Sequence, residues 1–306
     1  MNTLVLCSPA KINHFLHING QRPDGYHLIQ TLFQYLDYGD EISFTPLTHS
    51  HIAVQMAFAS GEDCGVPAEQ NLIYKIATHL QKTYHVHSGI DIRVTKKIPM
   101  GGGLGGGSSN AATTLLALNY VWKLNLPLKT LMQIGETFGA DIPCFLIGQS
   151  AWGEGIGTQL TPTILDEQYV VVLTPPCLVS TPKMYQNSQL TRNTSTLRIG
   201  TLEGLLKNGL FENAVRNDFQ QLVCQNYPIV AEYMAWLNQY AKAKLSGSGA
   251  SIFALVESKE KATTIIENLP PCYQAFVAKS VNRSPLHAQL INLGFFFESY
   301  WGVAKR

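Results

Sequence analysis

Residues 99–110 read PMGGGLGGGSSN, and the six glycines among them shape the interpretation of the whole chain. Glycine costs about 0.5 to 1 kcal/mol of backbone entropy relative to alanine, so six are tolerated where the backbone must approach a ligand closely. Exposed N–H groups at a helix start, reinforced by the helix dipole, bind anions. This segment, which we call the glycine loop (Pro99 to Gly107), therefore predicts a phosphate site.

The glycine loop lies between a strand pattern and a helix pattern. Apolar residues alternate over 90–94 and recur at helical spacing over 115–122. We expect Ser108, Ser109 and Asn110 to cap the helix, and the serine hydroxyls to reach phosphate or Mg²⁺. A flexible linker is a poor alternative between two periodic elements. The predicted order is strand, glycine loop, helix, which puts an anion site at the helix start.

Two common phosphate loops fit this segment only in part. A Walker A loop needs a lysine before its last Ser or Thr, and none stands near Ser108. Gly101, Gly103 and Gly106 match a dinucleotide-binding fingerprint, but no Asp or Glu occurs over 110–134, where its acidic residue is expected. A dinucleotide-dependent oxidoreductase nevertheless stays open as an alternative function.

The patterns along the rest of the chain predict an α+β fold with an N-terminal hairpin. Residues 12–18 alternate as a strand, and 22–25 supply the Pro and Gly of a reversal. Other predicted elements are an extended stretch at 28–38, a helix at 71–84, a strand at 169–173, helices near 212–224 and 228–241, and strands at 252–256 and 274–279. Thr181 and Pro182 are expected at the N-cap and first position of another helix.

Length and composition set wider limits. A chain of 306 residues predicts two domains, which we divide as 1–162 and 163–306 after the turn-rich stretch 153–163. With 14% charged residues and a net charge of +1, neither nucleic acid nor a membrane is expected as a partner. The six cysteines lack regular spacing, which favours buried free thiols in a reducing compartment. Without a leader pattern or a long apolar run, the expected location is cytoplasmic.

Three motifs occur in the order found in one kinase superfamily. They are SPAKIN at 8–13, the glycine loop followed by Ser-Ser, and LSGSGA at 245–250. The chain resembles the galactokinase, homoserine kinase, mevalonate kinase and phosphomevalonate kinase (GHMP) superfamily. The resemblance implies a two-domain small-molecule kinase fold, with an N-terminal ribosomal-protein-S5-like domain, a C-terminal ferredoxin-like domain and the active site in the cleft between them. It also implies ATP and Mg²⁺ as cofactors, with no obligatory protein partner.

Further motifs extend the resemblance over most of the chain. They are RPDGYH at 22–27, FQYLDYGD at 33–40, NLI at 71–73, GADIP at 139–143 and SPLH at 284–287. The doubled glycine triplet is similar to the branch whose acceptor is a cytidine diphosphate-linked methylerythritol. The resemblance thus implies transfer of phosphate from ATP to the 2-hydroxyl of that small molecule.

The same resemblance assigns the chemistry to Asp141 and Lys11. Asp141, within GADIP, is expected to take the proton of the attacking hydroxyl. Lys11, on the first strand, is expected to pair with Asp141 and to offset the charge that builds on the phosphoryl oxygens. Without the motif context, each would be interpreted as an ordinary surface charge.

The binding residues implied by the resemblance form two sets. The nucleotide set is Pro99, Met100, Gly101, Gly102, Gly103, Leu104, Gly105, Gly106, Gly107, Ser108, Ser109, Asn71 and Lys96. The acceptor set is Asn13, Tyr26, His27, Phe33, Thr181 and Tyr185. Tyr26 and Tyr185 are expected to sandwich the cytosine, while His27 offers one ring nitrogen as donor and one as acceptor. Metal ligands are not assigned beyond Ser108 or Ser109.

Two alternatives stand beside the kinase hypothesis. One is the oxidoreductase mentioned above, and the other is a catalytically silent nucleotide-binding relative, against which the presence of Lys11 and Asp141 argues. The aromatic-rich tail, residues 291–306, lies beyond the resemblance. The sequence leaves open whether this tail docks on its own domain or on a partner.

Overall fold

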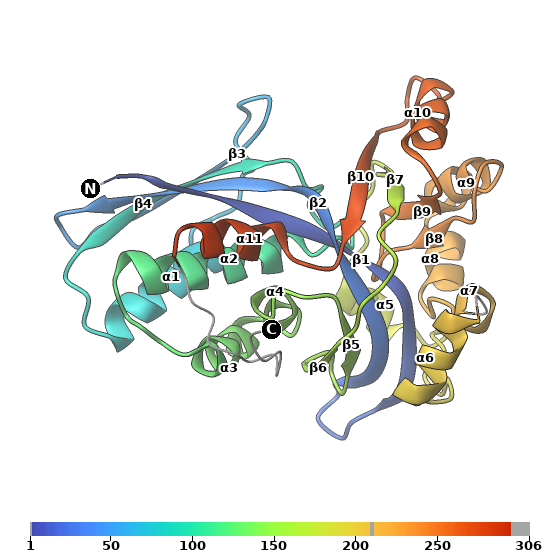
Figure 1. The fold of residues 1–306 in the computed structure, drawn as a ribbon, viewed down its shortest axis with the longest axis horizontal. Helices are drawn as coiled ribbons and strands as arrows, with labels where there is room; N and C mark the ends of the chain where they lie inside the picture. The colour runs from blue at the N-terminus through green and yellow to red at the C-terminus, as the bar shows by residue number, and fades with distance from the viewer. Residues whose placement is uncertain (1, 209–210, 295–306) are drawn as a thin grey trace.

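The computed structural model describes residues 2–208 and 211–294, which form two lobes connected by one long hairpin (Figure 1). β1 (Leu4–Gln21) and β2 (His27–Leu47) pair antiparallel along their length. The turn between them contains Gly25 at φ +90°, a conformation that favours glycine. The N-terminal hairpin predicted from alternation and turn residues is confirmed.

The first lobe packs helices against one face of a sheet (Figure 1). β4 (Gly89–Lys96) pairs antiparallel with β2, and β3 (Ile52–Phe58) pairs parallel with β4. The other elements of this lobe are α1 (Leu72–Thr83), α2 (Gly106–Val121), α3 (Leu128–Phe138), α4 (Ile142–Leu146), β5 (Ala151–Glu154) and β6 (Gln159–Pro162). α2 is buried along most of its length, because it lies at the centre of this core.

The second lobe is a smaller antiparallel sheet with helices around it. Its strands run in the order β10-β7-β9-β8, and β10 also pairs with β2 at Leu36 and Tyr35. These strands are β7 (Tyr169–Leu173), β8 (Lys244–Leu245), β9 (Ile252–Val256) and β10 (Ala275–Val281). The helices are α5 (Thr181–Gln186), α6 (Ile199–Lys207), α7 (Phe211–Ala214), α8 (Gln220–Asn226), α9 (Pro228–Leu237) and α10 (Lys259–Glu267). The expected α+β fold is confirmed.

Two predicted helix features differ in the structure. The helix expected near 212–224 is interrupted between α7 and α8, where Asn217 donates to the carbonyl of Leu245 and Asp218 accepts from the amide of Ile18. Asn and Asp side chains that bind backbone groups in this way compete with helical hydrogen bonds. The N-cap of α5 is Ser180 rather than Thr181, which is the first helical residue.

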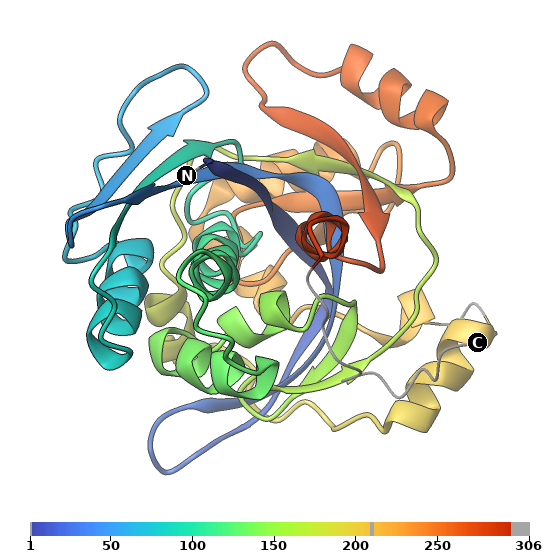
Figure 2. The same cartoon turned by 60° about the vertical axis from the view of Figure 1, so that its left-hand side comes forward.

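The C-terminal part of the described chain returns to the first lobe. α11 (Pro285–Asn292) buries Leu286 and Leu290 in the same core as α2, and Figure 2 shows it beside the β1–β2 ribbon. The boundary at residue 162 stays a prediction, since the chain crosses between the lobes again after it. Most of the tail, residues 295–306, lies outside the described residues, so its docking is not addressed.

Candidate active site

A cavity of about 1170 Å³ lies where the two lobes meet. Its wall includes the glycine loop, the β1–β2 turn, the starts of α1 and α4, α5 and the turn around Gly247. All residues of the two predicted binding sets line it except Leu104 and Ser109, which are buried. Lys11 and Asp141 line it as well. The structure thus brings together residues that are far apart in the sequence.

The start of α2 differs from the predicted capping arrangement. Gly105, at φ +74°, is the N-cap, and no side chain caps the helix. Ser108 therefore lies in the first turn, while Ser109 and Asn110 lie further inside the helix. Ser109 accepts a hydrogen bond from the Ser8 hydroxyl at 2.8 Å and is fully buried. Of these three residues, Ser108 and Asn110 line the cavity, and the Asn110 side chain is already bonded to Asp40 and Ser8.

Some of the loop glycines are required by packing against protein. A second glycine turn, Ser246 to Ser251, lies against the glycine loop: the amide of Ser251 donates to the carbonyl of Gly102, and the Ser246 hydroxyl donates to that of Gly103, both at 3.0 Å. A Cβ on Gly103 would lie 2.1 Å from the Ser246 carbonyl oxygen. Packing against protein is therefore sufficient to require glycine at position 103, although Gly103 also lines the cavity.

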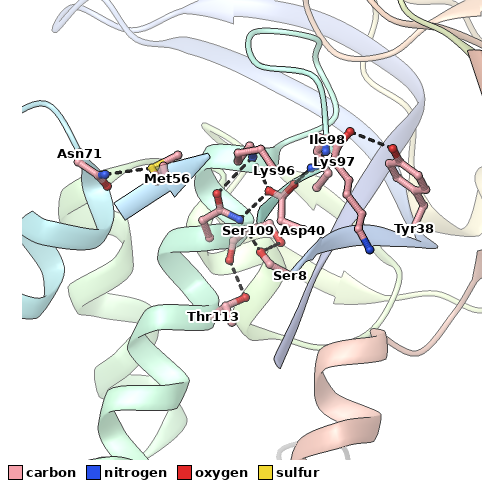
Figure 3. A network of polar contacts seen from close by, with 11 residues as sticks. Ser8, Tyr38, Asp40, Met56, Asn71, Lys96, Lys97, Ile98, Ser109 and Thr113 are labelled. Carbon is pink, nitrogen blue, oxygen red and sulfur yellow. Dashed lines mark hydrogen bonds and ion pairs between the residues drawn. The ribbon is translucent and has the colours of Figure 1, made fainter. Parts of the chain in front are cut away.

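Asp40, absent from the predicted sets, anchors the entrance to the glycine loop (Figure 3). One carboxylate oxygen accepts from the amides of Lys97 and Ile98 at 2.7 and 2.8 Å. The other accepts from Asn110 at 2.8 Å and from the Lys96 ammonium. The FQYLDYGD motif contained this residue, but its role depends on contacts that only the fold creates.

Lys96 and Asn71 both line the cavity while also serving the fold. The Lys96 ammonium pairs with Asp40, and both side chains are almost completely buried. Asn71 is the N-cap of α1, where its side-chain oxygen accepts from the amide of Ile73 at 2.9 Å and its amide contacts the Met56 sulfur. Figure 3 shows Asn71 beside Met56 and Lys96 beside Asp40.

Lys11 and Asp141 converge from β1 and the start of α4. The Lys11 ammonium lies 4.0 Å from an Asp141 oxygen, with the lysine side chain 5% exposed and the aspartate side chain 57% exposed. The same ammonium donates to the Asn13 side chain and, at 3.2 Å, to the Gly103 carbonyl. Asp141 makes no side-chain cap bond to α4. A fixed cation thus lies beside a carboxylate that is open to the cavity.

The predicted acceptor residues Asn13 and Thr181 already have protein partners. The Asn13 amide donates to the Thr31 hydroxyl at 2.8 Å, and the Thr181 and Ser248 hydroxyls lie 2.6 Å apart. Thr31 and Ser248 also line the cavity. Neither was predicted, although Ser248 belongs to the late glycine motif.

His27 and Tyr185 stack directly on each other, with ring centroids 4.6 Å apart and 27° between planes. Tyr26 is 58% exposed, and Phe33 is buried. Arg192 donates to the Nε2 atom of His27 at 3.1 Å. The predicted sandwich of cytosine between Tyr26 and Tyr185 stays a prediction, and one nitrogen of His27 is already engaged. Burial first, and then the Arg192 charge, lower the pKa of His27.

Neither a metal cluster nor a membrane span is found in the part of the chain that the structure describes. No three His, Cys, Asp or Glu side chains gather there to hold an ion, and no helix there is long and apolar enough to cross a bilayer. All six cysteines are free, but only Cys144 is fully buried. The expectation of buried thiols therefore holds for that residue alone.

Family comparisons agree with this fold and cavity. Residues 71–149 match the family described as GHMP kinases N terminal domain, and residues 201–274 match GHMP kinases C terminal. The fold and the site are those of a GHMP kinase, an ATP-dependent small-molecule kinase. The dinucleotide-dependent oxidoreductase interpretation of the glycine loop is not supported.

Individual relatives narrow the class. A 4-diphosphocytidyl-2-C-methyl-D-erythritol kinase from Hahella chejuensis is 45% identical, covering 94% of this chain and 97% of its own. One from Marinobacter nauticus is 46% identical, covering 96% and 99%. A crystal structure of 4-(cytidine 5'-diphospho)-2C-methyl-D-erythritol kinase superposes with a TM-score of 0.76 at 28% identity, covering 90% of this chain and 99% of that one. The chain belongs to the 4-diphosphocytidyl-2-C-methyl-D-erythritol kinase family.

Proposed function

We propose that this protein transfers the γ-phosphate of ATP to the 2-hydroxyl of 4-diphosphocytidyl-2-C-methyl-D-erythritol. The observation that carries the proposal is the juxtaposition of Lys11 and Asp141 in a cavity walled on one side by the glycine loop and on another by His27 and Tyr185. A phosphate donor site and an aromatic site for a base thus border the same charged pair. Family membership supports the same reaction.

Asp141 is the proposed general base. Its carboxylate is open to the cavity and lies beside the Lys11 ammonium. In an in-line transfer the acceptor oxygen bonds to the γ-phosphorus, the bond from that phosphorus to the β-phosphate oxygen breaks, and the hydroxyl proton passes to Asp141. The positive charge of Lys11 offsets negative charge on the transferred group. Hydrogen bonds to the Asn13 side chain and the Gly103 carbonyl hold its ammonium in place.

The phosphates are proposed to bind at the start of α2. The first-turn N–H groups of that helix have no side-chain cap, and a Cβ on Gly107 would meet open space. Mg²⁺, when bound, would neutralise charge on the phosphate oxygens. The Ser108 hydroxyl is its candidate protein ligand, since it is an oxygen donor on the cavity wall. The Ser109 hydroxyl is unsuited, because it is buried against Ser8.

The cytidine end is proposed to bind at His27, Tyr185 and the exposed ring of Tyr26. Aromatic faces support stacking of a base, and His27 supplies hydrogen bonding.

The proposed location of the protein is the cytoplasm. That compartment supplies ATP and keeps thiols reduced, in agreement with six free cysteines.

An acceptor panel tests this proposal. ADP release would be measured with ATP, Mg²⁺ and, separately, 4-diphosphocytidyl-2-C-methyl-D-erythritol, homoserine and mevalonate. We expect turnover with the cytidine acceptor at a kcat/KM at least about a hundredfold above the other two, because only that acceptor occupies the aromatic site. ADP release that ignores the added alcohol, or that favours another acceptor, would contradict the proposal.

A further inference from the structure

Arg192 is held in one orientation by four hydrogen bonds. Its Nε donates to Nε2 of His27 at 3.1 Å. Its terminal nitrogens donate to the carbonyls of Leu190 at 3.2 Å, Tyr185 at 2.7 Å and Asn187 at 2.8 Å. The guanidinium therefore bridges the start of β2 and the end of α5. It is committed to protein partners, although it lines the cavity.

This contact restricts the chemistry of His27. A guanidinium has only donors and stays protonated in proteins, so Nε2 of His27 must accept the bond. A neutral imidazole that accepts at Nε2 carries its proton on Nδ1. The lowered pKa of His27, caused by burial and by Arg192, agrees with a neutral ring.

The other ring nitrogen of His27, Nδ1, makes no hydrogen bond to the described residues. Within residues 2–208 and 211–294, this atom is also not among the side-chain atoms sealed from solvent. The ring lines the cavity, and Tyr185 covers one of its faces. The His27 ring therefore has a single N–H donor, at Nδ1, left for a ligand in the cavity.

We infer that Arg192 is a positioning residue that sets base selectivity by fixing this tautomer of His27. The inference deepens the proposed function and rests on it. Atom N3 of cytosine accepts a hydrogen bond, whereas N3 of uracil carries a proton, so an Nδ1–H donor pairs with the first and opposes the second. The sequence predicted that one ring nitrogen of His27 donates to the base and the other accepts from it. In this inference only Nδ1 bonds the base, as a donor.

Nitrogen NMR tests the tautomer. Protein labelled with ¹⁵N-histidine would be recorded near pH 7.5, with the His27 signals assigned from a His27→Gln variant. We expect Nδ1 protonated and Nε2 unprotonated in the wild type, and a mixture of tautomers in Arg192→Met. The matched control is Arg198→Met, which removes an exposed guanidinium from the same loop and should leave the His27 signals unchanged. A wild-type proton on Nε2, or on both nitrogens, would overturn the inference.

Acceptor kinetics test the selectivity. The wild type should prefer the cytidine acceptor over its uridine and 3-deazacytidine counterparts by about 5- to 100-fold in kcat/KM, because a donor left unpaired in the site is costly. Arg192→Met should lose most of this preference, and Arg192→Lys, which keeps one donor, should retain part of it. Equal use of 3-deazacytidine by the wild type, or an unchanged preference in Arg192→Met, would overturn the inference.

The two measurements distinguish a failure of the role of Arg192 from a failure of the proposed kinase function. Turnover of the cytidine acceptor without the expected preference removes the role of Arg192 and leaves the proposed function standing. No wild-type turnover of that acceptor overturns the function and the selectivity together. If Arg192→Met does not fold, the tautomer and the acceptor preference of Arg192→Lys, compared with those of the wild type, decide.

Discussion

Gly103 and Gly107 belong to the same run of glycines but have opposite surroundings. A Cβ on Gly103, at φ +74°, would collide with the Ser246 carbonyl oxygen, whereas a Cβ on Gly107 would have no heavy atom within 4 Å. Gly103 is thus required where the two lobes meet. A substitution at Gly103 would disturb packing as well as any bound phosphate. Gly107 is the cleaner probe.

Gly107→Val is predicted to weaken ATP binding at least about tenfold, or about 1.4 kcal/mol, because its branched side chain occupies the space where phosphate is proposed to bind. Calorimetric titration with ATP measures this. Gly200→Val is the matched control, since Gly200 is also the second residue of a helix and also has no heavy atom within 4 Å of a Cβ. Wild-type ATP affinity in folded Gly107→Val would count against a phosphate site here.

Asp141→Asn is predicted to lower turnover by roughly 10² to 10⁴ while leaving ATP affinity and stability near wild type. The side chain is mostly exposed and caps nothing, so its loss should not disturb the fold. Steady-state kinetics measure the effect, with Asp166→Asn, an exposed site off the cavity wall, as the control. Turnover above about a third of wild type would leave less than 1 kcal/mol for a base and would remove Asp141 from that role.

At the residue scale, the motifs predicted which side chains line the cavity better than how those side chains are bonded. Lys11, Asp141 and His27 stand in short motifs, and all three line it. Arg192 and Asp40 could not be assigned roles, because their partners come from other elements of the fold.

The carboxylate of Asp40 connects three elements. It receives hydrogen bonds from the end of β4, from the first residues after that strand and from α2 (Figure 3). Ser8 on β1 joins the network through Asn110 at 2.9 Å. The glycine loop is therefore fixed at its entrance by β2 and at its exit by the helix that it begins.

Asp40→Asn is predicted to lower the free energy of unfolding by about 3 to 5 kcal/mol, because the buried Lys96 ammonium loses its counter-ion and faces an amide donor. Urea denaturation measures the loss. Adding Lys96→Met should recover part of it. As a control, Glu257→Gln breaks the exposed pair with Lys261 and should leave the transition midpoint essentially unchanged. An equally small effect at Asp40 would mean that this network does not hold the loop.

His287, on α11, makes the stability of the protein depend on pH. Its Nε2 lies 3.0 Å from the Leu146 carbonyl oxygen, and burial, with a smaller contribution from Arg283, lowers its pKa from 6.5 to about 4. Between these values the unfolded chain binds a proton that the folded chain does not. Stability should therefore fall as pH drops from 6.5 to 4, by about 3 kcal/mol in total from this group.

Unfolding free energies of the wild type and His287→Gln, measured from pH 8 to pH 4, test this. The difference between the two proteins should shrink as the pH falls, since the variant has no histidine to protonate at this site. A constant difference across the range would show that His287 does not titrate as described.

At the element scale, the spacing of apolar residues was sufficient to predict an element where that element is long or buried throughout. The predicted strands at 169–173 and 252–256 have the bounds of β7 and β9. The helix near 212–224 could not be predicted correctly, because Asn217 and Asp218 bind backbone groups of distant segments. The hairpin of β5 and β6 was hidden in a stretch interpreted only as turns.

Over the whole molecule, the β1–β2 hairpin contributes to both lobes. Leu6 and Phe33 are in the core with α2, whereas Leu16 and Ile29 are in the core of the second lobe. The two glycine turns meet beside this hairpin, which brings the proposed phosphate and acceptor sites to one cavity. The predicted two-lobed fold follows from the motif order, but the return of α11 to the first lobe depends on a long-range contact that periodicity does not reveal.

The central claim is direct transfer of the γ-phosphate to one hydroxyl of the cytidine acceptor. Phosphorus NMR of a reaction with equal amounts of ATP, Mg²⁺ and 4-diphosphocytidyl-2-C-methyl-D-erythritol tests it most directly. We predict one new phosphomonoester signal on the 2-hydroxyl, formed together with ADP, while the diphosphate of the acceptor stays intact. Release of inorganic phosphate without that signal, or no loss of ATP, would contradict the claim.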